Sequence, residues 1–186
     1  MRLFVAVNLP PDLRQALWDA AGPLRQRDYP VRWVAADAIH VTLKFLGEVA
    51  EDRASELARS VTAIAGAAKS FTLPLGGFGV FPAPERPRVV WAGCEAVPPL
   101  ELLQHDVERT MHELGFPLEG RPFRPHLTLG RVRDGAKARE FAGFAATLDT
   151  LRFTGEAMVT SVDLMQSTLT PNGATYTARH RAPLAE

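Results

Sequence analysis

The sequence predicts an α+β fold built as a single domain of 186 residues. Two observations support this class. Segments with strand-like and helix-like apolar spacing interleave along the chain, and several neighbouring strand segments are separated by turns too short for a parallel crossover. Antiparallel pairing must therefore be substantial. Because no Ser/Gly-rich linker divides the chain, we expect one domain that spans residues 1–186.

The N-terminal half is expected to contain three strands and two helices. A continuous apolar run forms the first strand, and two prolines with an aspartate then open the first helix. A helical apolar face predicts the second helix, and a glycine ends the strand before it. The expected elements are strands at 3–9, 31–34 and 39–46, a connector at 36–38, a helix from Pro10 to about Arg27, and a helix at 51–68.

The C-terminal half is richer in strands. Proline and glycine again mark the boundaries, with Pro98 at a helix start and Gly115 at its end. A proline-containing loop at 82–87 is expected to join two strands, and a connector at 116–125 precedes another. The expected elements are strands at 71–81, 88–94, 126–132, 151–154, 157–166 and 174–180, helices at 100–114 and 138–148, and a turn at 170–173.

Composition limits the classes of function. With 21 basic and 21 acidic residues, the formal net charge is zero, which argues against binding nucleic acid mainly through bulk charge. Cys94 is the single cysteine, so a disulfide within the chain or a thiolate zinc site is excluded. The apolar run near the N-terminus is too short for a signal peptide or a membrane helix. We therefore expect a cytoplasmic protein without membrane association.

The strongest chemical signal is a tetrapeptide that occurs twice. The copies are His40-Val41-Thr42-Leu43 and His126-Leu127-Thr128-Leu129, 86 positions apart (126 − 40). With this composition, the probability that two of the five histidines start such a tetrapeptide by chance is roughly below one in a thousand. The duplication therefore indicates a function.

The spacing within each copy has a geometric consequence. In a strand, residues two apart face the same way, so His40 and Thr42 project together while Val41 and Leu43 point into the core. Each copy then offers an imidazole, which transfers protons near neutral pH, beside a hydroxyl that donates to a phosphoryl oxygen. Two such units across a cleft would hold one phosphate from both sides and supply an acid and a base.

These motifs and their flanks resemble the 2H phosphoesterases, a family defined by two His-x-Thr-x motifs. Within that family the sequence is most similar to the bacterial RNA 2′,3′-cyclic phosphodiesterases, often labelled 2′-5′ RNA ligases. The likeness spans nearly the whole chain. The segments that carry it are Met1-Arg2-Leu3-Phe4-Val5-Ala6, Arg32-Trp33-Val34, Lys44-Phe45-Leu46-Gly47 and the stretch from Phe123 to Arg131 around the second motif.

The resemblance implies a fold and a reaction. The implied fold is bilobal, with pseudo-twofold symmetry and antiparallel sheets that flank a central cleft, helices lying outside. The implied reaction is hydrolysis of RNA 2′,3′-cyclic phosphate ends to 2′-phosphomonoesters, with 2′-5′ RNA joining as a side activity and with no metal or other cofactor. The implied roles are proton donor for His40, proton acceptor for His126 and phosphate binding for Thr42 and Thr128.

Some questions stay open from the sequence alone. The two near-identical motifs do not by themselves distinguish acid from base. Alternative functions are a phosphodiesterase that acts on another small cyclic or 2′-5′ linked nucleotide, and a non-catalytic module that binds RNA or nucleotides. The expected partners are RNA with 2′,3′-cyclic phosphate ends or small cyclic nucleotides, and a monomer is the simplest oligomeric state.

Residues around the motifs extend the predicted site. The stretch from Gly120 to Val132 holds three arginines and no acidic residue, a local positive field in a neutral protein. Arg124 would share the catalytic face if the strand begins that early. Arg131 has the opposite parity, so it would point away unless a bulge turns it. Both are candidate phosphate ligands.

Three further side chains have competing interpretations. Phe45 and Phe123 are candidates for base stacking, although alternation with Leu43 favours a core position for Phe45. Lys44 shares the parity of His40, but an exposed strand lysine without a role is the preferred interpretation. Glu108 and His112, four residues apart on one predicted helix, are expected to form a surface pair.

Overall fold

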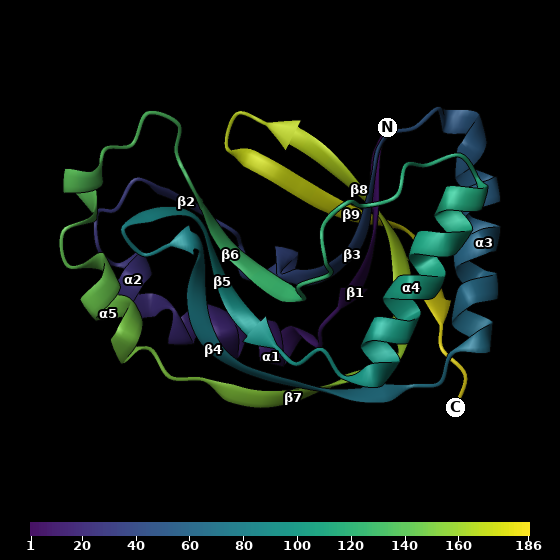
Figure 1. The fold of residues 1–186 in the computed structure, drawn as a ribbon, viewed down its shortest axis with the longest axis horizontal. Helices are drawn as coiled ribbons and strands as arrows, with labels where there is room; N and C mark the ends of the chain where they lie inside the picture. Colours follow the sequence, from purple (N-terminus) through teal and green to yellow (C-terminus); the bar gives the residue numbers. More distant parts are fainter.

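The computed structural model describes all residues from 1 to 186 and has the predicted α+β architecture, with a large antiparallel sheet and helices outside it (Figure 1). The strands are β1 (Arg2–Asn8), β2 (Val31–Trp33), β3 (His40–Glu48), β4 (Phe71–Ala83), β5 (Arg86–Cys94), β6 (His126–Val132), β7 (Thr154–Val159), β8 (Ser161–Thr170) and β9 (Gly173–Pro183). The α-helices are α1 (Pro11–Ala20), α2 (Gly22–Arg25), α3 (Ala54–Ala67), α4 (Pro98–Glu113) and α5 (Phe144–Thr150). Short 3₁₀ turns are η1 (Ala36–Ala38), η2 (Glu51–Arg53) and η3 (Ala138–Phe141).

The sheet consists of two groups of strands joined at one place. Its nine strands follow the order β7-β4-β5-β6-β3-β1-β8-β9, and β2 pairs with β6 as well. At the middle, β3 and β6 share a single register pair, Val41 with Leu127. Helices α3 and α4 lie beside the β3-β1-β8-β9 group, whereas α2 and α5 lie beside the β4-β5-β6 group (Figure 1).

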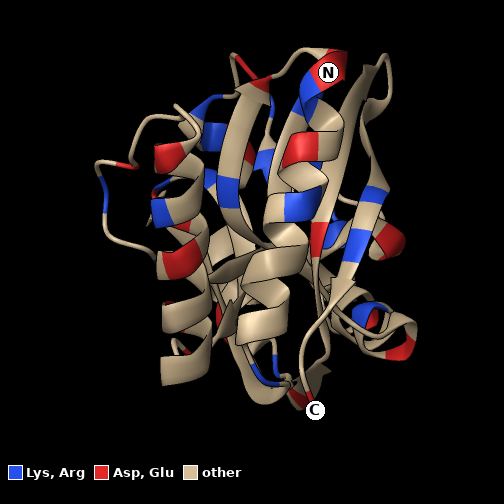
Figure 2. Cartoon of the chain, turned by 90° about the vertical axis from the view of Figure 1, so that its right-hand side faces the viewer, with Lys and Arg blue, Asp and Glu red and all other residues tan.

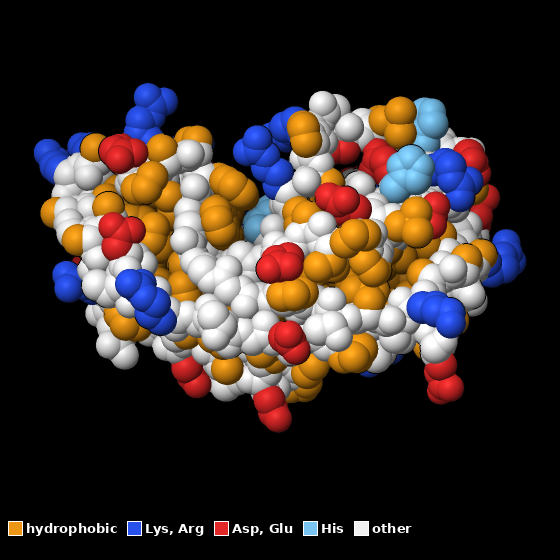
Figure 3. Space-filling model, turned by 60° about the horizontal axis from the view of Figure 1, so that its bottom comes forward, with side chains coloured by type: hydrophobic (Ala, Val, Ile, Leu, Met, Phe, Trp, Pro, Cys, Tyr) orange, Lys and Arg blue, Asp and Glu red, His pale blue; other side chains and the backbone are white.

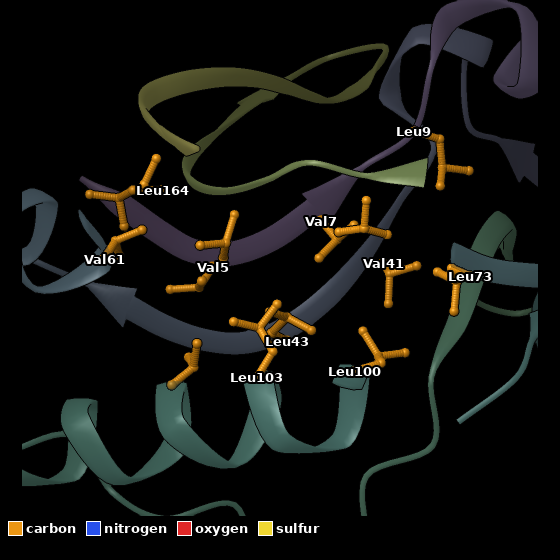
Figure 4. Close-up of a cluster of buried hydrophobic side chains, with 14 of the residues drawn as sticks. Val5, Val7, Leu9, Val41, Leu43, Val61, Leu73, Leu100, Leu103 and Leu164 are labelled. Carbon is orange, nitrogen blue, oxygen red and sulfur yellow. The ribbon is translucent and has the colours of Figure 1, made fainter. Parts of the chain in front are cut away.

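The main hydrophobic core packs against one face of the central strands β1 and β3. Helix α4 contributes an apolar face that includes Leu100 and Leu103, and Val5, Val41 and Leu43 face it from β1 and β3 (Figure 4). These five side chains are at most 4% exposed. Because the core side of β3 is packed, the alternate side chains of this strand are directed to the opposite face.

Several predicted boundaries are wrong for identifiable reasons. The first helix does not continue to Arg27, because Pro23 cannot donate a backbone hydrogen bond inside a helix, and a separate short helix, α2, begins at Gly22. The predicted helix at 138–148 is interrupted by Gly143, whose φ of 76° lies in the left-handed region.

Two errors concern strands. The prolines at 82–87 predict a loop, but β4 and β5 continue through this segment as a hairpin in which Pro82 lies opposite Pro87. The predicted strands at 151–154 and 157–166 are replaced by β7 and β8, which meet at Thr160. In short stretches rich in proline or threonine, the alternation of apolar and polar residues is weak. The strand boundaries there depend on which strands pair with them, which the sequence does not show.

Candidate active site

The pairing of β3 with β6 brings the two His-x-Thr motifs together. The paired residues, Val41 and Leu127, occupy the middle position of each motif, and both are fully buried. Paired residues share a face of the sheet, so their neighbours in the motifs all project from the opposite face. The strands are antiparallel, and each histidine therefore lies on the side of the other motif's threonine. The four side chains are His40, Thr42, His126 and Thr128.

Both imidazoles are held in the same way. Nδ1 of His40 lies 2.8 Å from the carbonyl oxygen of Ala38, and Nδ1 of His126 lies 2.7 Å from that of Arg124. A carbonyl oxygen only accepts, so Nδ1–H donates and, in the neutral ring, Nε2 carries the lone pair. Nε2 of His40 lies 3.0 Å from Oγ1 of Thr42, whose hydroxyl donates to it. Each motif thus presents Nε2 as the atom able to exchange a proton.

Aromatic side chains pack against both histidines. The ring of His40 lies 4.9 Å from that of Phe4 and 5.1 Å from that of Tyr176, measured between centroids. The ring of His126 lies 5.1 Å from that of Phe81, nearly perpendicular to it. None of the three aromatic residues, which come from β1, β9 and β4, is among the predicted site residues. The only sequence signal is the position of Phe4 in a segment that carries the family resemblance.

The protein environment disfavours the charged form of His40. Burial is the main cause that lowers the pKa of His40 to about 4, and the positive charges of Arg131 and His126 lower it further. The hydrogen bond to Ala38 acts in the opposite direction. His40 is therefore neutral at pH 7 in the free protein.

A β-bulge in each motif strand changes which residues face the site. In β6 the register skips Leu129, so that Arg131 lies opposite Val89 while Thr128 lies opposite Trp91. Residues 89 and 91 share a face of β5, and the bulge therefore turns Arg131 toward the side of His126. Without the bulge, strict alternation along β6 would direct the Arg131 side chain to the face opposite that of His126.

The bulge in β3 overturns two predictions. The register skips Leu43, which places Phe45 on the face of His40 and turns Lys44 to the core side. The Phe45 side chain is 62% exposed, so the expected core position is wrong. Lys44 is only 5% exposed and forms an ion pair with Glu108, so the expected exposed lysine is also wrong. The expected surface pair of Glu108 with His112 does not form, since His112 Nδ1 contacts the Phe116 carbonyl instead.

The remaining predicted site residues lie at the entry to β6. The strand begins at His126, so Arg124 precedes it and the condition for a shared strand face is not met. The Arg124 side chain is exposed. Phe123 is half-buried and packs against the main core.

Two residues that sequence reasoning missed lie close to this site. Arg32 of β2 pairs in register with Arg131 and is exposed. A Cβ added to Gly173, the first residue of β9, would lie 3.3 Å from Cδ of Arg32. Asp163 is fully buried beneath the site, and its Oδ2 accepts a hydrogen bond of 2.7 Å from Nδ2 of Asn8, the register partner of His40. The only sequence signal is the position of Arg32 in a segment that carries the family resemblance.

One face of the molecule is hollowed. Figure 3 shows a hollow with a histidine side chain at its floor and Lys or Arg side chains at its rim. On the side that carries α3 and α4, acidic and basic residues are mixed (Figure 2). No group of three or more His, Cys, Asp or Glu side chains is arranged to hold a metal ion. No helix has the length and apolar character needed to cross a membrane.

Two imidazoles and two threonine hydroxyls gathered on one face of an antiparallel sheet are the features of a 2H phosphoesterase. The chain belongs to the 2′-5′ RNA ligase superfamily, which it matches over residues 10–170. It is 33% identical over 177 residues to the RNA 2′,3′-cyclic phosphodiesterase of Methanothermobacter thermautotrophicus, covering 95% of each chain.

Solved structures agree in fold along the whole chain. The crystal structure of TT0787 of Thermus thermophilus superposes with a TM-score of 0.83 at 30% identity, covering 99% of this chain and 98% of that one. The structure of E. coli LigT complexed with 3′-AMP gives a TM-score of 0.79 at 28% identity, covering 100% and 98%.

Proposed function

We propose that the protein is an RNA 2′,3′-cyclic phosphodiesterase, which hydrolyses terminal 2′,3′-cyclic phosphates to 2′-phosphomonoesters. The observation that carries this proposal is the Val41–Leu127 pair, which projects both His-x-Thr units from one face. Relatives that cover nearly the whole chain bear this name. The complex of E. coli LigT with 3′-AMP supports a nucleotide with a phosphate at the ribose as the ligand class.

The proposed mechanism is a single in-line displacement. Nε2 of His126 accepts a proton from a water molecule as its oxygen forms a bond to phosphorus. The bond from phosphorus to O3′ breaks at the same time, and Nε2 of His40 donates the proton that O3′ gains. The products are a 2′-phosphomonoester and a free 3′-hydroxyl, with no cofactor required. Each positioned acid or base contributes about 10²- to 10⁴-fold in reactions of this kind.

The proposed substrate contacts come from both groups of strands. The hydroxyls of Thr42 and Thr128 and the guanidinium of Arg131 are assigned to the cyclic phosphate, whose charge an Arg fork matches well. Two exposed arginines, Arg124 before β6 and Arg32 beside its far end, are assigned to the other phosphates of the RNA. In this proposal residues 1–186 form one bilobal domain, with pseudo-twofold symmetry about the central strand pair and the substrate cleft between its halves.

Base stacking is assigned to Phe45 and not to Phe123. Phe45 is exposed and its ring centroid lies 6.1 Å from that of Phe4, which itself contacts His40. An aromatic ring in that position offers a face to the terminal base whatever its identity. Phe123 packs against the core, so its ring has less free area.

The low pKa of His40 bears on the assignment of roles. A proton donor must be charged before the reaction, and His40 is neutral in the free protein because its pKa is about 4. A bound phosphate anion would offset the charge of Arg131 and raise the pKa of His40 toward the range that a donor needs. The proposed donor role of His40 therefore depends on substrate binding.

Two alternatives use the same site. A 2′-5′ linked or other small cyclic nucleotide would use the same acid, base and phosphate contacts, and joining of 2′-5′ ends is the reverse of cleaving that bond. A module that binds RNA or nucleotides without turnover would need only the arginines and threonines. The presence of two imidazoles, each with Nδ1 committed to a carbonyl and Nε2 left to exchange a proton, favours catalysis over binding alone.

The decisive test is turnover of an RNA that ends in a 2′,3′-cyclic phosphate, measured in the presence of EDTA. We expect the parent protein to be active, and both His40→Ala and His126→Ala to lose at least about 100-fold in kcat. His105→Ala, an exposed histidine on α4, is the matched control and should retain full activity. An inactive parent, or full activity of either active-site variant, contradicts the proposal; loss with EDTA alone contradicts only the absence of a metal.

A further inference from the structure

A buried ion pair lies behind the first motif, on the core side of β3. Nζ of Lys44 donates to Oε1 of Glu108 on α4 and to the carbonyl oxygen of Pro117, each at 2.8 Å. Oε1 of Glu108 also accepts from the backbone N–H of Glu119 at 2.6 Å. The pair therefore joins three parts of the chain, namely the motif-one strand, helix α4 and the segment that leads to motif two.

Burial makes this arrangement unusual. The Lys44 side chain is 4% exposed and that of Glu108 is 15% exposed. Removing two charges from water is costly, so a buried pair is weak evidence for stability, and apolar residues of the same volume often serve stability equally well. A role for the charges in fixing a particular geometry would account for a pair in this place.

The sheet itself leaves that geometry weakly determined. Strands β3 and β6 share one register pair, whereas β1 and β3 share seven. The segment before β6 is attached by Lys44 and Glu108 at Pro117 and Glu119, and by the Phe123 side chain, which packs against the main core. From residue 120 to residue 125 the chain has no regular structure until β6 begins.

We propose that Lys44 and Glu108 are positioning residues, which anchor the segment before His126 to the motif-one strand and so set the separation of the two imidazoles. The inference rests on the proposed function for its kinetic consequence, but the anchoring itself does not require turnover. Lys44 acts from behind the site, because the bulge at Leu43 turns its side chain to the core side.

The test separates positioning from stability with a double variant. Lys44→Met alone leaves the Glu108 carboxylate buried without its partner and should lower the melting temperature strongly. Lys44→Met combined with Glu108→Leu removes both charges at similar volume and should restore most of the melting temperature. If the pair positions the segment, the double variant still loses about 10- to 100-fold in kcat on the cyclic-phosphate RNA, since small displacements of catalytic groups have effects of this size.

A control variant and an NMR measurement separate a positioning role from a general effect on the protein. Arg109→Met with Glu113→Leu removes an exposed ion pair on the same helix and should leave both kcat and melting temperature unchanged. The imidazole NMR signals are followed with inorganic phosphate as the probe, which requires no turnover. We expect phosphate to shift the signals of His40 and His126 in the parent, and to shift only those of His40 in the Lys44→Met, Glu108→Leu variant.

The possible results are distinguishable. A stable double variant with parental kcat and parental phosphate shifts at both histidines overturns the positioning role. A parent without turnover contradicts the proposed function, and the phosphate shifts then decide the positioning role alone. Lys44→Arg, which keeps the charge but not the compact ammonium, should recover only part of the loss in kcat.

Discussion

His40 lies in an environment that opposes its own protonation. Its ring packs against those of Phe4 and Tyr176, and Arg131 places positive charge nearby. Nδ1 is committed to the Ala38 carbonyl, so the proton that matters is the one on Nε2. In the proposed mechanism, a group held neutral in the free protein acquires its proton when the substrate anion binds, which would couple the proposed acid role of His40 to the presence of substrate.

This environment predicts the titration of His40. Its folded-state pKa of about 4 lies below the value of about 6.5 for an unfolded histidine, so His40 should titrate near pH 4 in the free protein. Inorganic phosphate should raise that midpoint. Both values follow from the imidazole NMR signals, and a midpoint near 6.5 without phosphate would contradict the assignment.

The same shift affects stability. Between pH 6.5 and 4 the unfolded chain binds a proton at His40 that the folded chain does not, so stability is fully present above pH 6.5 and is lost as the pH falls. From about pH 7.5 to about pH 5 the parent should lose on the order of 1–2 kcal/mol more than His40→Asn, measured by urea unfolding. Equal losses in the two proteins would show that His40 is not the responsible group.

At the level of elements, two β-bulges determine the composition of the site. The alternation of each motif is sufficient to predict which side chains of a His-x-Thr unit share a face. Alternation fails beyond the bulges, where Lys44 turns inward and Phe45 turns toward His40. A bulge depends on the residues of the neighbouring strand, so no pattern within the motif strand reveals it.

The β6 bulge can be tested through Gly130. A Cβ at this position would lie 2.6 Å from Cγ1 of Val31 and 2.7 Å from Cε3 of Trp33, so Gly130→Ala must displace these two side chains or the strands that carry them. We expect a loss of about 1–3 kcal/mol in the free energy of unfolding and reduced kcat/KM, because Arg131 adjoins the displaced residue. Urea unfolding and the RNA assay measure the two effects.

A matched control is available in helix α3. Gly66 has no atom within 4 Å of its would-be Cβ, so Gly66→Ala meets no obstacle. Alanine favours a helix over glycine by up to about 1 kcal/mol, and the control should be neutral or stabilised with full activity. A Gly130→Ala protein as stable and active as this control would refute the packing argument.

For the molecule as a whole, the zero net charge restricts how the proposed RNA substrate can be held. Some Lys or Arg side chains lie at the rim of the hollow, and acidic and basic residues are mixed on the side that carries α3 and α4 (Figures 2 and 3), so the proposed substrate contact is with one terminal phosphate and not with a long duplex. The α+β class, the antiparallel pairing and the superfamily are predictable from the sequence and are confirmed. The single register pair between β3 and β6 is not predictable from the sequence, because it depends on a contact between residues 86 positions apart (127 − 41).

The central claim is that the two motifs act together on one cyclic phosphate and break its bond to O3′. The most direct measurement is ³¹P NMR of a short RNA ending in a 2′,3′-cyclic phosphate, incubated with the protein and EDTA. We expect the cyclic phosphate signal to be replaced by that of a 2′-phosphomonoester alone. Persistence of the cyclic phosphate, or conversion to a 3′-phosphomonoester, would contradict it.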